Sequence, residues 1–216
     1  MDMTPERGVG WTNSGRLIRR MTEMESAWER KMESYFLRTP KQINHPIRKM
    51  IIERGMGKTV LDGGCASCID YPLWKERGFK YTGLDFTPRF LKYAKELYPE
   101  INVVGGDLAN IPFGNKSFHT SVNKDIWEHQ PPEKYIAVCN EVWRVTENRM
   151  MIAFYLAPWD EPTKYELVDD LFYKNHYNKQ DVMVLLNSLD DARITDIIEG
   201  IGFNHSALYV VDRVPS

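Results

Sequence analysis

The sequence predicts an α/β fold: a doubly wound, Rossmann-like sheet of about seven strands, mainly parallel with a C-terminal antiparallel hairpin. Two observations carry this prediction. Short apolar runs alternate with helical patterns between residues 58 and 156, which is typical of repeated strand–helix–strand units. Near the C-terminus, two further strand-like runs are joined by a connection too short for a crossover helix, so they should pair antiparallel.

The composition is that of an ordinary globular protein. The chain has 216 residues, 43% of them hydrophobic, and a formal net charge of −2. This length suits one domain with appendages, and the charge argues against a nucleic-acid partner. The sequence contains neither a run of about 18 apolar residues nor a signal-peptide pattern, so we expect no membrane association. Three cysteines fit a reducing cytoplasm, where we expect the protein to reside.

The N-terminal part predicts helices. After a lead rich in glycine and proline, apolar residues recur in steps of three and four over residues 18–37, with charged residues between them. Pro40 ends that helix, and a shorter helix is expected over residues 46–54. We assign residues 1–57 to an N-terminal helical lid and residues 58–216 to the Rossmann-like domain.

The period then changes to that of an α/β sheet. Strands are expected over residues 58–62, 81–85, 101–104, 118–123 and 150–156. Helices are expected from the turn after the first strand to about residue 77, and over residues 88–97 and 132–144. Pro88 suits the first turn of its helix. The run 150–156 is apolar throughout, which is typical of a central parallel strand.

The C-terminal third is predicted to hold a helix over residues 178–189 and strands over 194–199 and 207–212. A lid insertion is expected at about 157–178. This insertion is rich in aromatic residues, and two interpretations stay open: they line an acceptor pocket, or they pack the insertion against the sheet.

Four expected strands end in residues suited to ligand binding, and in an open α/β sheet ligands lie at the carboxyl ends of the strands. The first strand runs into the small-residue turn VLDGGCASC, residues 60–68. The second ends at Asp85, where a carboxylate can accept hydrogen bonds from two ribose hydroxyls. The third leads to Asp107, an acceptor for an adenine amino group, and the fourth to the polar loop 123–129.

Two rival interpretations of the first turn are weaker. A dinucleotide fingerprint starting at Gly64 fails, because Ala66 and Ile69 stand where glycines are required. Cys65 and Cys68 form a C-x-x-C pair, which suits a redox dithiol or half of a zinc site. The remaining Cys139 is isolated, so we expect no metal site.

These segments resemble motifs of class I S-adenosylmethionine-dependent methyltransferases, of the branch that acts on small molecules. VLDGGCASC is similar to the first motif, an acid followed by a G-x-G-x-G turn, with Ala66 and Cys68 in place of the second and third glycines. GLDFTPRFLKYAKE is similar to the second motif, and GDLANIPFGNKSFHTSVNKDIWEH to the third and fourth.

The resemblance implies S-adenosyl-L-methionine as cofactor and S-adenosyl-L-homocysteine as product. The cofactor-binding residues it implies are Asp62, Gly63, Gly64, Cys65, Ala66, Asp85, Phe86, Asp107, Leu108 and Lys124. For catalysis we single out His129 first and Asp125 second, as candidates for a general base.

The function expected is methyl transfer to an oxygen or nitrogen atom of a small-molecule acceptor. Two alternatives stay open: a non-catalytic scaffold subunit that keeps the fold, motivated by Ala66 and Cys68, and a methyltransferase acting on RNA or protein. A homodimer is also compatible with the sequence.

Overall fold

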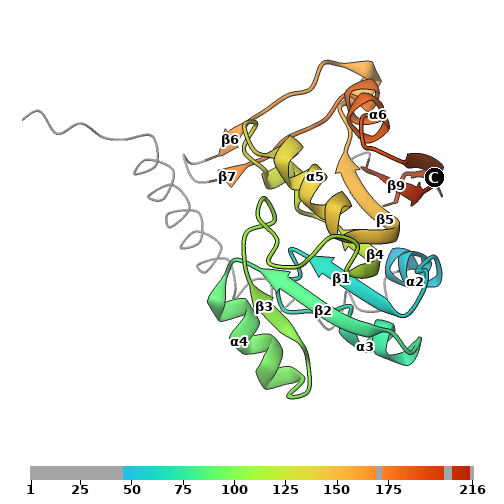
Figure 1. Ribbon diagram of the computed structural model, residues 1–216. Coiled ribbons are helices and arrows are strands. Elements are labelled where there is room, and N and C mark those ends of the chain that lie inside the picture. The colour runs from blue at the N-terminus through green and yellow to red at the C-terminus, as the bar shows by residue number, and fades with distance from the viewer. Residues whose placement is uncertain (1–45, 169–171, 202–205, 215–216) are drawn as a thin grey trace, which may run out of the picture.

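The computed structural model describes residues 46–168, 172–201 and 206–214. These ranges form one seven-stranded sheet flanked by helices, and a separate two-stranded sheet (Figure 1). The α-helices are α2 (Pro46–Glu53), α3 (Tyr71–Glu76), α4 (Pro88–Leu97), α5 (Tyr135–Val145) and α6 (Lys179–Asn187), with 3-10 turns η1 (Trp127–His129) and η2 (Pro158–Asp160). The strands are β1 (Thr59–Gly63), β2 (Lys80–Asp85), β3 (Val103–Gly105), β4 (Phe118–Asn123), β5 (Thr146–Tyr155), β6 (Leu167–Val168), β7 (Phe172–Tyr173), β8 (Ala192–Glu199) and β9 (Ser206–Arg213).

The large sheet has the strand order β3-β2-β1-β4-β5-β9-β8. The first five strands in the chain are parallel, whereas β9 pairs antiparallel with both β5 and β8. The doubly wound sheet and the C-terminal antiparallel hairpin are therefore confirmed. The order turns back on itself between β1 and β4, and such a switch point is where open α/β sheets bind ligands.

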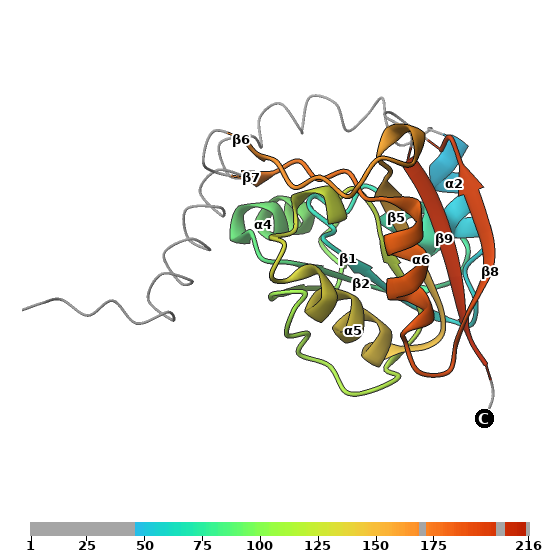
Figure 2. The ribbon, with the colours of Figure 1, turned by 90° about the horizontal axis from the view of Figure 1, so that it is seen from above.

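Two hydrophobic clusters fill the space between the sheet and its helices. One contains side chains of α5 and α6, and the other contains side chains of α2 and α3, with Ala94 of α4. Figure 2 shows the ribbons of α2, α5 and α6 around the strands of the sheet. Strand β5 contributes to both clusters, because successive side chains of a strand point to opposite faces. Ile152 and Phe154 join the first cluster, whereas Met151 and Ala153 join the second.

Most element boundaries agree with the sequence prediction. Helix α4 and strand β4 have the predicted bounds, whereas β5 begins at Thr146, four residues earlier than predicted. The residues directly after Thr146 are polar, so the sequence does not indicate that the strand begins there. The Thr146 hydroxyl donates to the Val142 carbonyl oxygen at 2.6 Å, so α5 passes into β5 with no intervening loop. The short strands β6 and β7 were not predicted, because two residues show no period.

The predicted helix over residues 18–37 and most of the predicted N-terminal lid lie outside the described residues. Among the residues that are described, no helix is long and apolar enough to cross a membrane.

Candidate functional site

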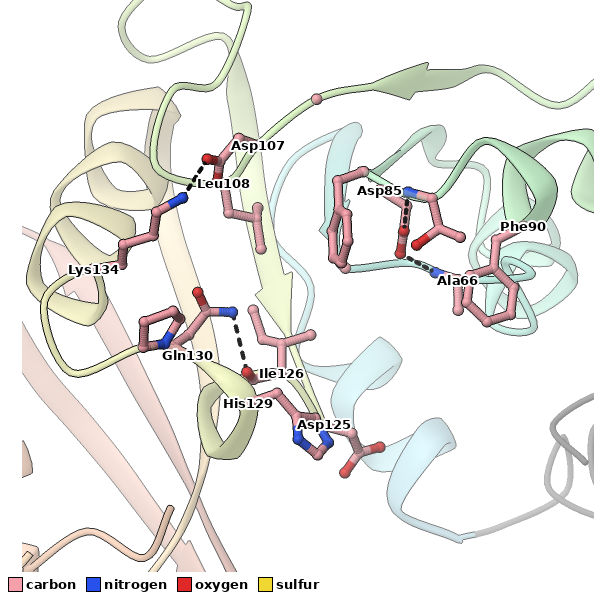
Figure 3. A pocket seen from close by; sticks show the side chains of 15 residues that line it. Ala66, Asp85, Phe90, Asp107, Leu108, Asp125, Ile126, His129, Gln130 and Lys134 are labelled. Carbon is pink, nitrogen blue, oxygen red and sulfur yellow. Dashed lines mark hydrogen bonds and ion pairs between the residues drawn. The ribbon is translucent and has the colours of Figure 1, made fainter. Parts of the chain in front are cut away.

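An open pocket lies at the carboxyl ends of β1 to β4 (Figure 3). The empty space inside it and at its mouth, open solvent included, amounts to about 880 Å³. Its lining residues are Gly64, Ala66, Asp85, Phe86, Thr87, Phe90, Gly106, Asp107, Leu108, Asp125, Ile126, His129, Gln130, Pro131 and Lys134. Eight residues that the sequence singled out are among them: Gly64, Ala66, Asp85, Phe86, Asp107, Leu108, Asp125 and His129.

The turn after β1 has left-handed backbone at all three glycine positions of the motif. The φ angles are +74° at Gly64, +45° at Ala66 and +55° at Cys68. Glycine adopts this conformation freely, whereas other residues are strained in it. At Gly64 there is also no room for a side chain, because an added Cβ would lie 2.3 Å from Cγ2 of Ile126. All three positions therefore adopt left-handed backbone although only one of them is a glycine.

Neither thiol of this turn lines the pocket. Cys65 and Cys68 are buried, and both sulfur atoms occupy the space that a side chain at Gly83 would take. A Cβ added to Gly83 would lie 2.8 Å from Sγ of Cys65 and 2.9 Å from Sγ of Cys68. The bulk of Cys68 is thus accommodated by the missing side chain on β2.

Redox and metal chemistry find little support at this C-x-x-C pair. Both cysteines are free, and burial raises the pKa of the Cys65 thiol well above its usual range, which suppresses the reactive thiolate. The described residues contain no group of three or more side chains that could hold a metal ion.

Asp85 closes β2 and faces the pocket. One carboxylate oxygen accepts the Ala66 backbone N–H and the other accepts the Thr87 backbone N–H, both at 2.9 Å. Burial raises the pKa of Asp85, against the lowering effect of these backbone hydrogen bonds. Each oxygen has a second lone-pair direction, so the carboxylate can still accept from two neighbouring hydroxyls of a ligand. The aromatic side chains of Phe86 and Phe90 lie at the same wall.

Asp107 marks the pocket wall that follows β3. Its Oδ1 accepts the Ala109 backbone N–H at 3.0 Å, and its Oδ2 lies 2.8 Å from Nζ of Lys134 (Figure 3). Lys134 was not predicted, because it precedes α5 and only the fold brings it to Asp107. Leu108 adds apolar surface beside this ion pair.

Behind the turn lies a buried cluster of charges that does not line the pocket. Asp62 accepts a hydrogen bond from the Tyr81 hydroxyl at 2.7 Å, and burial raises the pKa of Asp62 to about 6. Lys124 lies 3.4 Å from Asp70, which also pairs with Arg48. Burial opposes ionisation of Asp70, yet the two cations outweigh it and hold its pKa below the usual value.

Four of the residues that the resemblance implied for cofactor binding therefore stand behind the pocket lining: Asp62, Gly63, Cys65 and Lys124. They shape the turn and the loop after β4. Gly63, for example, leaves space for Asn123, whose Nδ2 donates to the Gly63 carbonyl oxygen at 3.1 Å.

The loop after β4 brings both predicted catalytic candidates to the pocket. Asp125 has left-handed backbone, with φ +57°, and its Oδ1 accepts from the Tyr155 hydroxyl at 3.3 Å. Nδ1 of His129 lies 2.7 Å from the Tyr173 carbonyl oxygen. The small sheet containing Tyr173 thus fixes the imidazole ring from the side of the insertion.

Glu128 is a functional candidate that sequence reasoning missed. Its side chain is 4% exposed, beside His129, and burial raises its pKa to about 8, with a further contribution from the negative charge of Asp125. Residues 127–129 form a 3-10 turn, and neither a helical nor a strand period predicts which side chain of such a turn points inward.

Two aromatic residues of the insertion pack in the interior, and none of those that the structure describes lines the pocket. Phe172 and Tyr177 are buried, and the Tyr177 hydroxyl donates to the Trp127 carbonyl oxygen at 2.7 Å. Trp159, in contrast, is 92% exposed. No residue of the described part of the insertion, 157–168 and 172–178, is among the pocket-lining residues.

Comparisons with known proteins agree with this geometry. Residues 60–149 match the family model of the methyltransferase domain. A probable S-adenosylmethionine-dependent methyltransferase of Mycolicibacterium smegmatis is 24% identical over 113 residues, which are 52% of this chain and 42% of that protein. The chain thus spans less than half the length of this curated relative.

Two solved structures share the fold. One is the 1,6-didemethyltoxoflavin-N1-methyltransferase of Burkholderia thailandensis, with bound 1,6-didemethyltoxoflavin and S-adenosylhomocysteine. The TM-score is 0.74 and the sequence identity 14%, and the match covers 98% of this chain and 94% of that chain. The other is the magnesium protoporphyrin IX methyltransferase of Synechocystis PCC 6803 with bound S-adenosylhomocysteine. Here the TM-score is 0.69 and the sequence identity 15%, and the match covers 92% of this chain and 99% of that chain.

The motif order, the strand order and the family match all point the same way. Residues 60–149 match the methyltransferase domain, and the described residues have the Rossmann-like methyltransferase fold.

Proposed function

We propose that this protein transfers a methyl group from S-adenosyl-L-methionine to an oxygen or nitrogen atom of a small-molecule acceptor. The observation that carries the proposal is the pocket at the switch point, where the first turn, Asp85 and Asp107 meet at successive strand ends. The two related structures named above hold S-adenosylhomocysteine, and their names describe small-molecule acceptors.

The residues present suit such a cofactor. The carboxylate of Asp85 keeps acceptor capacity for two ribose hydroxyls, and we assign Asp107 as the acceptor for an adenine amino group. Leu108 and Ile126 give the apolar surface that an adenine ring requires. Gly64 lets the backbone approach the ligand without a side chain between them.

Once bound, the cofactor supplies a methyl group on a positively charged sulfur. The protein must then hold the acceptor atom in line with that methyl group and exclude water, and such positioning supplies several kcal/mol of the catalysis, on the order of 7–11 in the best cases. We assign this task to the loop after β4. Within it, His129 is the candidate general base, and Asp125 is the candidate for orienting the acceptor.

The test is calorimetric titration of the full chain with S-adenosyl-L-methionine and with S-adenosyl-L-homocysteine. We expect saturable one-site binding of both. Asp85→Ala removes two charge-assisted hydrogen bonds to the ribose and should weaken binding about 10- to 100-fold. Asp190→Ala, which removes an exposed carboxylate between α6 and β8, is the matched control and should bind as the wild type does.

The result that refutes the proposal is a folded protein that binds neither ligand. The strain at Ala66 and Cys68 would then have closed the site, and the scaffold alternative would replace the enzyme. If both ligands bind, incubation with methyl-labelled cofactor and separate pools of small molecules, RNA and protein identifies the class of acceptor by where the label appears.

A further inference from the structure

Glu128 carries a buried carboxyl group that the fold leaves partly unsatisfied. Among the described residues, its Oε2 has no hydrogen-bond partner, although the atom is inaccessible to solvent. Leaving a buried acceptor without a partner costs about 1–3 kcal/mol, more if it is charged. The fold nevertheless fixes Glu128 firmly, because its backbone carbonyl oxygen accepts the Asn175 N–H at 2.7 Å. A rigidly held carboxyl group that can still accept a hydrogen bond suggests a partner that binds reversibly.

The neighbouring His129 lies against the other oxygen of this carboxyl group, Oε1, and its protonation identifies the partner of the carboxyl group as a proton. A carbonyl oxygen only accepts hydrogen bonds, so Nδ1 of His129 must carry hydrogen and donate it to Tyr173. In the neutral ring, Nε2 then has only a lone pair, and it lies 3.6 Å from Oε1 of Glu128. Two acceptors facing each other repel unless a proton lies on one of them. Glu128 and His129 are therefore most stable as a pair that holds one proton.

The surroundings keep this proton available near neutral pH. Burial is the largest influence on Glu128, and together with the negative charge of Asp125 it raises the pKa of this carboxyl group to about 8. Two groups lower the pKa of Glu128 and so oppose this shift: the positive charge of Lys124, from the same loop, and a side-chain hydrogen bond with Tyr155, from β5. Tyr177, which follows β7, also faces this carboxyl group.

We propose that Glu128 and His129 act as a proton-accepting pair for an acceptor whose nucleophilic atom carries a proton, as in a phenol, an enol or a ring N–H. The inference rests on the proposed methyl transfer and adds Glu128 to it. His129 is the member that lines the pocket, and Glu128 is a positioning residue that acts through it.

The step balances with groups already present. The acceptor atom forms its new bond to the methyl carbon with its own lone pair, and the bond from that carbon to sulfur breaks with both electrons left on sulfur. The pair first gives the proton that it holds at rest to solvent, which a cation in the pocket favours. The proton of the acceptor then passes to the lone pair on Nε2 of His129. The imidazolium so formed lies next to the ionised carboxylate of Glu128, which stabilises it.

Sinefungin tests the proposal without an identified acceptor. This analogue of the cofactor carries CH–NH₃⁺ in place of the sulfonium methyl, so its ammonium group occupies the reacting position. At pH 7 the pair is mostly protonated, and a cation beside it favours its deprotonated form. Binding of sinefungin to the wild type should therefore release about one proton more than binding of S-adenosyl-L-homocysteine. Calorimetry in phosphate and in Tris measures that number from the buffer dependence of the heat.

Two variants test whether the released proton comes from Glu128 and His129. Glu128→Gln keeps the size of the side chain but cannot ionise, so the extra proton should disappear while S-adenosyl-L-homocysteine still binds. His129→Asn retains an N–H for the Tyr173 carbonyl oxygen and should also lose it. Glu133→Gln, an exposed carboxylate of the same region, is the control and should release the proton as the wild type does. Thermal melting of each variant verifies that it is folded.

The outcomes separate the two proposals. Equal proton release with sinefungin and S-adenosyl-L-homocysteine in the wild type, or an extra release that persists in Glu128→Gln, overturns the role of Glu128 and leaves the methyltransferase proposal intact. Absence of binding of all cofactor ligands by the folded wild type refutes the methyltransferase proposal itself.

Discussion

Gly64→Ala should destabilise this protein strongly although it adds a single methyl group. The new Cβ would lie 2.3 Å from Cγ2 of Ile126, and φ at this position is +74°. The left-handed backbone should cost about 1–2 kcal/mol, and forcing an extra methyl group into the packed turn about 1–3 kcal/mol. We therefore expect the free energy of unfolding to fall by about 2–5 kcal/mol.

Gly78 provides a matched control for the backbone contribution. Its φ is +76°, and an added Cβ would meet nothing within 4 Å. Gly78→Ala should therefore cost only the strain of about 1–2 kcal/mol. The difference between the two alanine variants measures the overlap with Ile126.

A double-mutant cycle identifies the side chain responsible. Ile126→Ala removes Cγ2, after which the nearest remaining atom, Cβ of Ile126, is 3.4 Å from the new methyl group. In that background Gly64→Ala should cost no more than Gly78→Ala, which gives a coupling of about 1–3 kcal/mol. Urea unfolding followed by circular dichroism, at an unchanged m-value, gives these energies. Additive effects of the two substitutions would refute this account of the turn.

Two further predictions concern buried charges. The pKa of Asp62 is raised to about 6 in the folded state, so the folded protein binds more protons than the unfolded chain between about pH 4 and 6, and its stability falls as pH rises through that window. Asp62→Asn cannot ionise and should remove this fall. Urea titrations should therefore show the free energy of unfolding of the variant, relative to wild type, rising by about 3 kcal/mol from pH 4 to pH 7. A difference that stays constant with pH contradicts the raised pKa of Asp62. Arg149 binds both oxygens of Asp212, at 2.6 and 2.7 Å, and donates to the Arg54 carbonyl oxygen at 2.8 Å. Arg149→Met should lower the free energy of unfolding by about 2–3 kcal/mol. Arg149→Lys loses the bidentate geometry and should lower it by at least half as much. If thermal unfolding shows the lysine variant to be as stable as wild type, the bidentate pair does not contribute as described.

The sequence predicts this fold well because its local signals agree with the tertiary structure. Pro88 fixes the first turn of α4, and the apolar residues of β5 identify the centre of the sheet. The parallel order then follows from the alternation of strands and helices. The start of β5 was predicted four residues too late, because at Thr146 a polar stretch continues the strand directly from a helix.

The site was predicted less completely, for a physical reason. Residues at strand ends can be placed from sequence, because the carboxyl ends of parallel strands share one edge, and Asp85 and Asp107 are examples. The depth of a side chain cannot be placed in this way. Asp62 and Lys124 lie behind the lining, whereas Lys134 reaches it from the start of a helix, and the turn 127–129 directs Glu128 inward.

The position of the two thiols over Gly83 makes the first turn and β2 a single co-adapted unit. A turn carrying glycines at positions 66 and 68 could not simply be grafted into this chain, since loss of the Cys68 thiol would leave part of the space above Gly83 empty. Conversely, a larger residue at position 83 requires the thiols to leave, because its Cβ would lie within 3 Å of both sulfur atoms. Strand and turn therefore have to be exchanged together in any redesign of this domain.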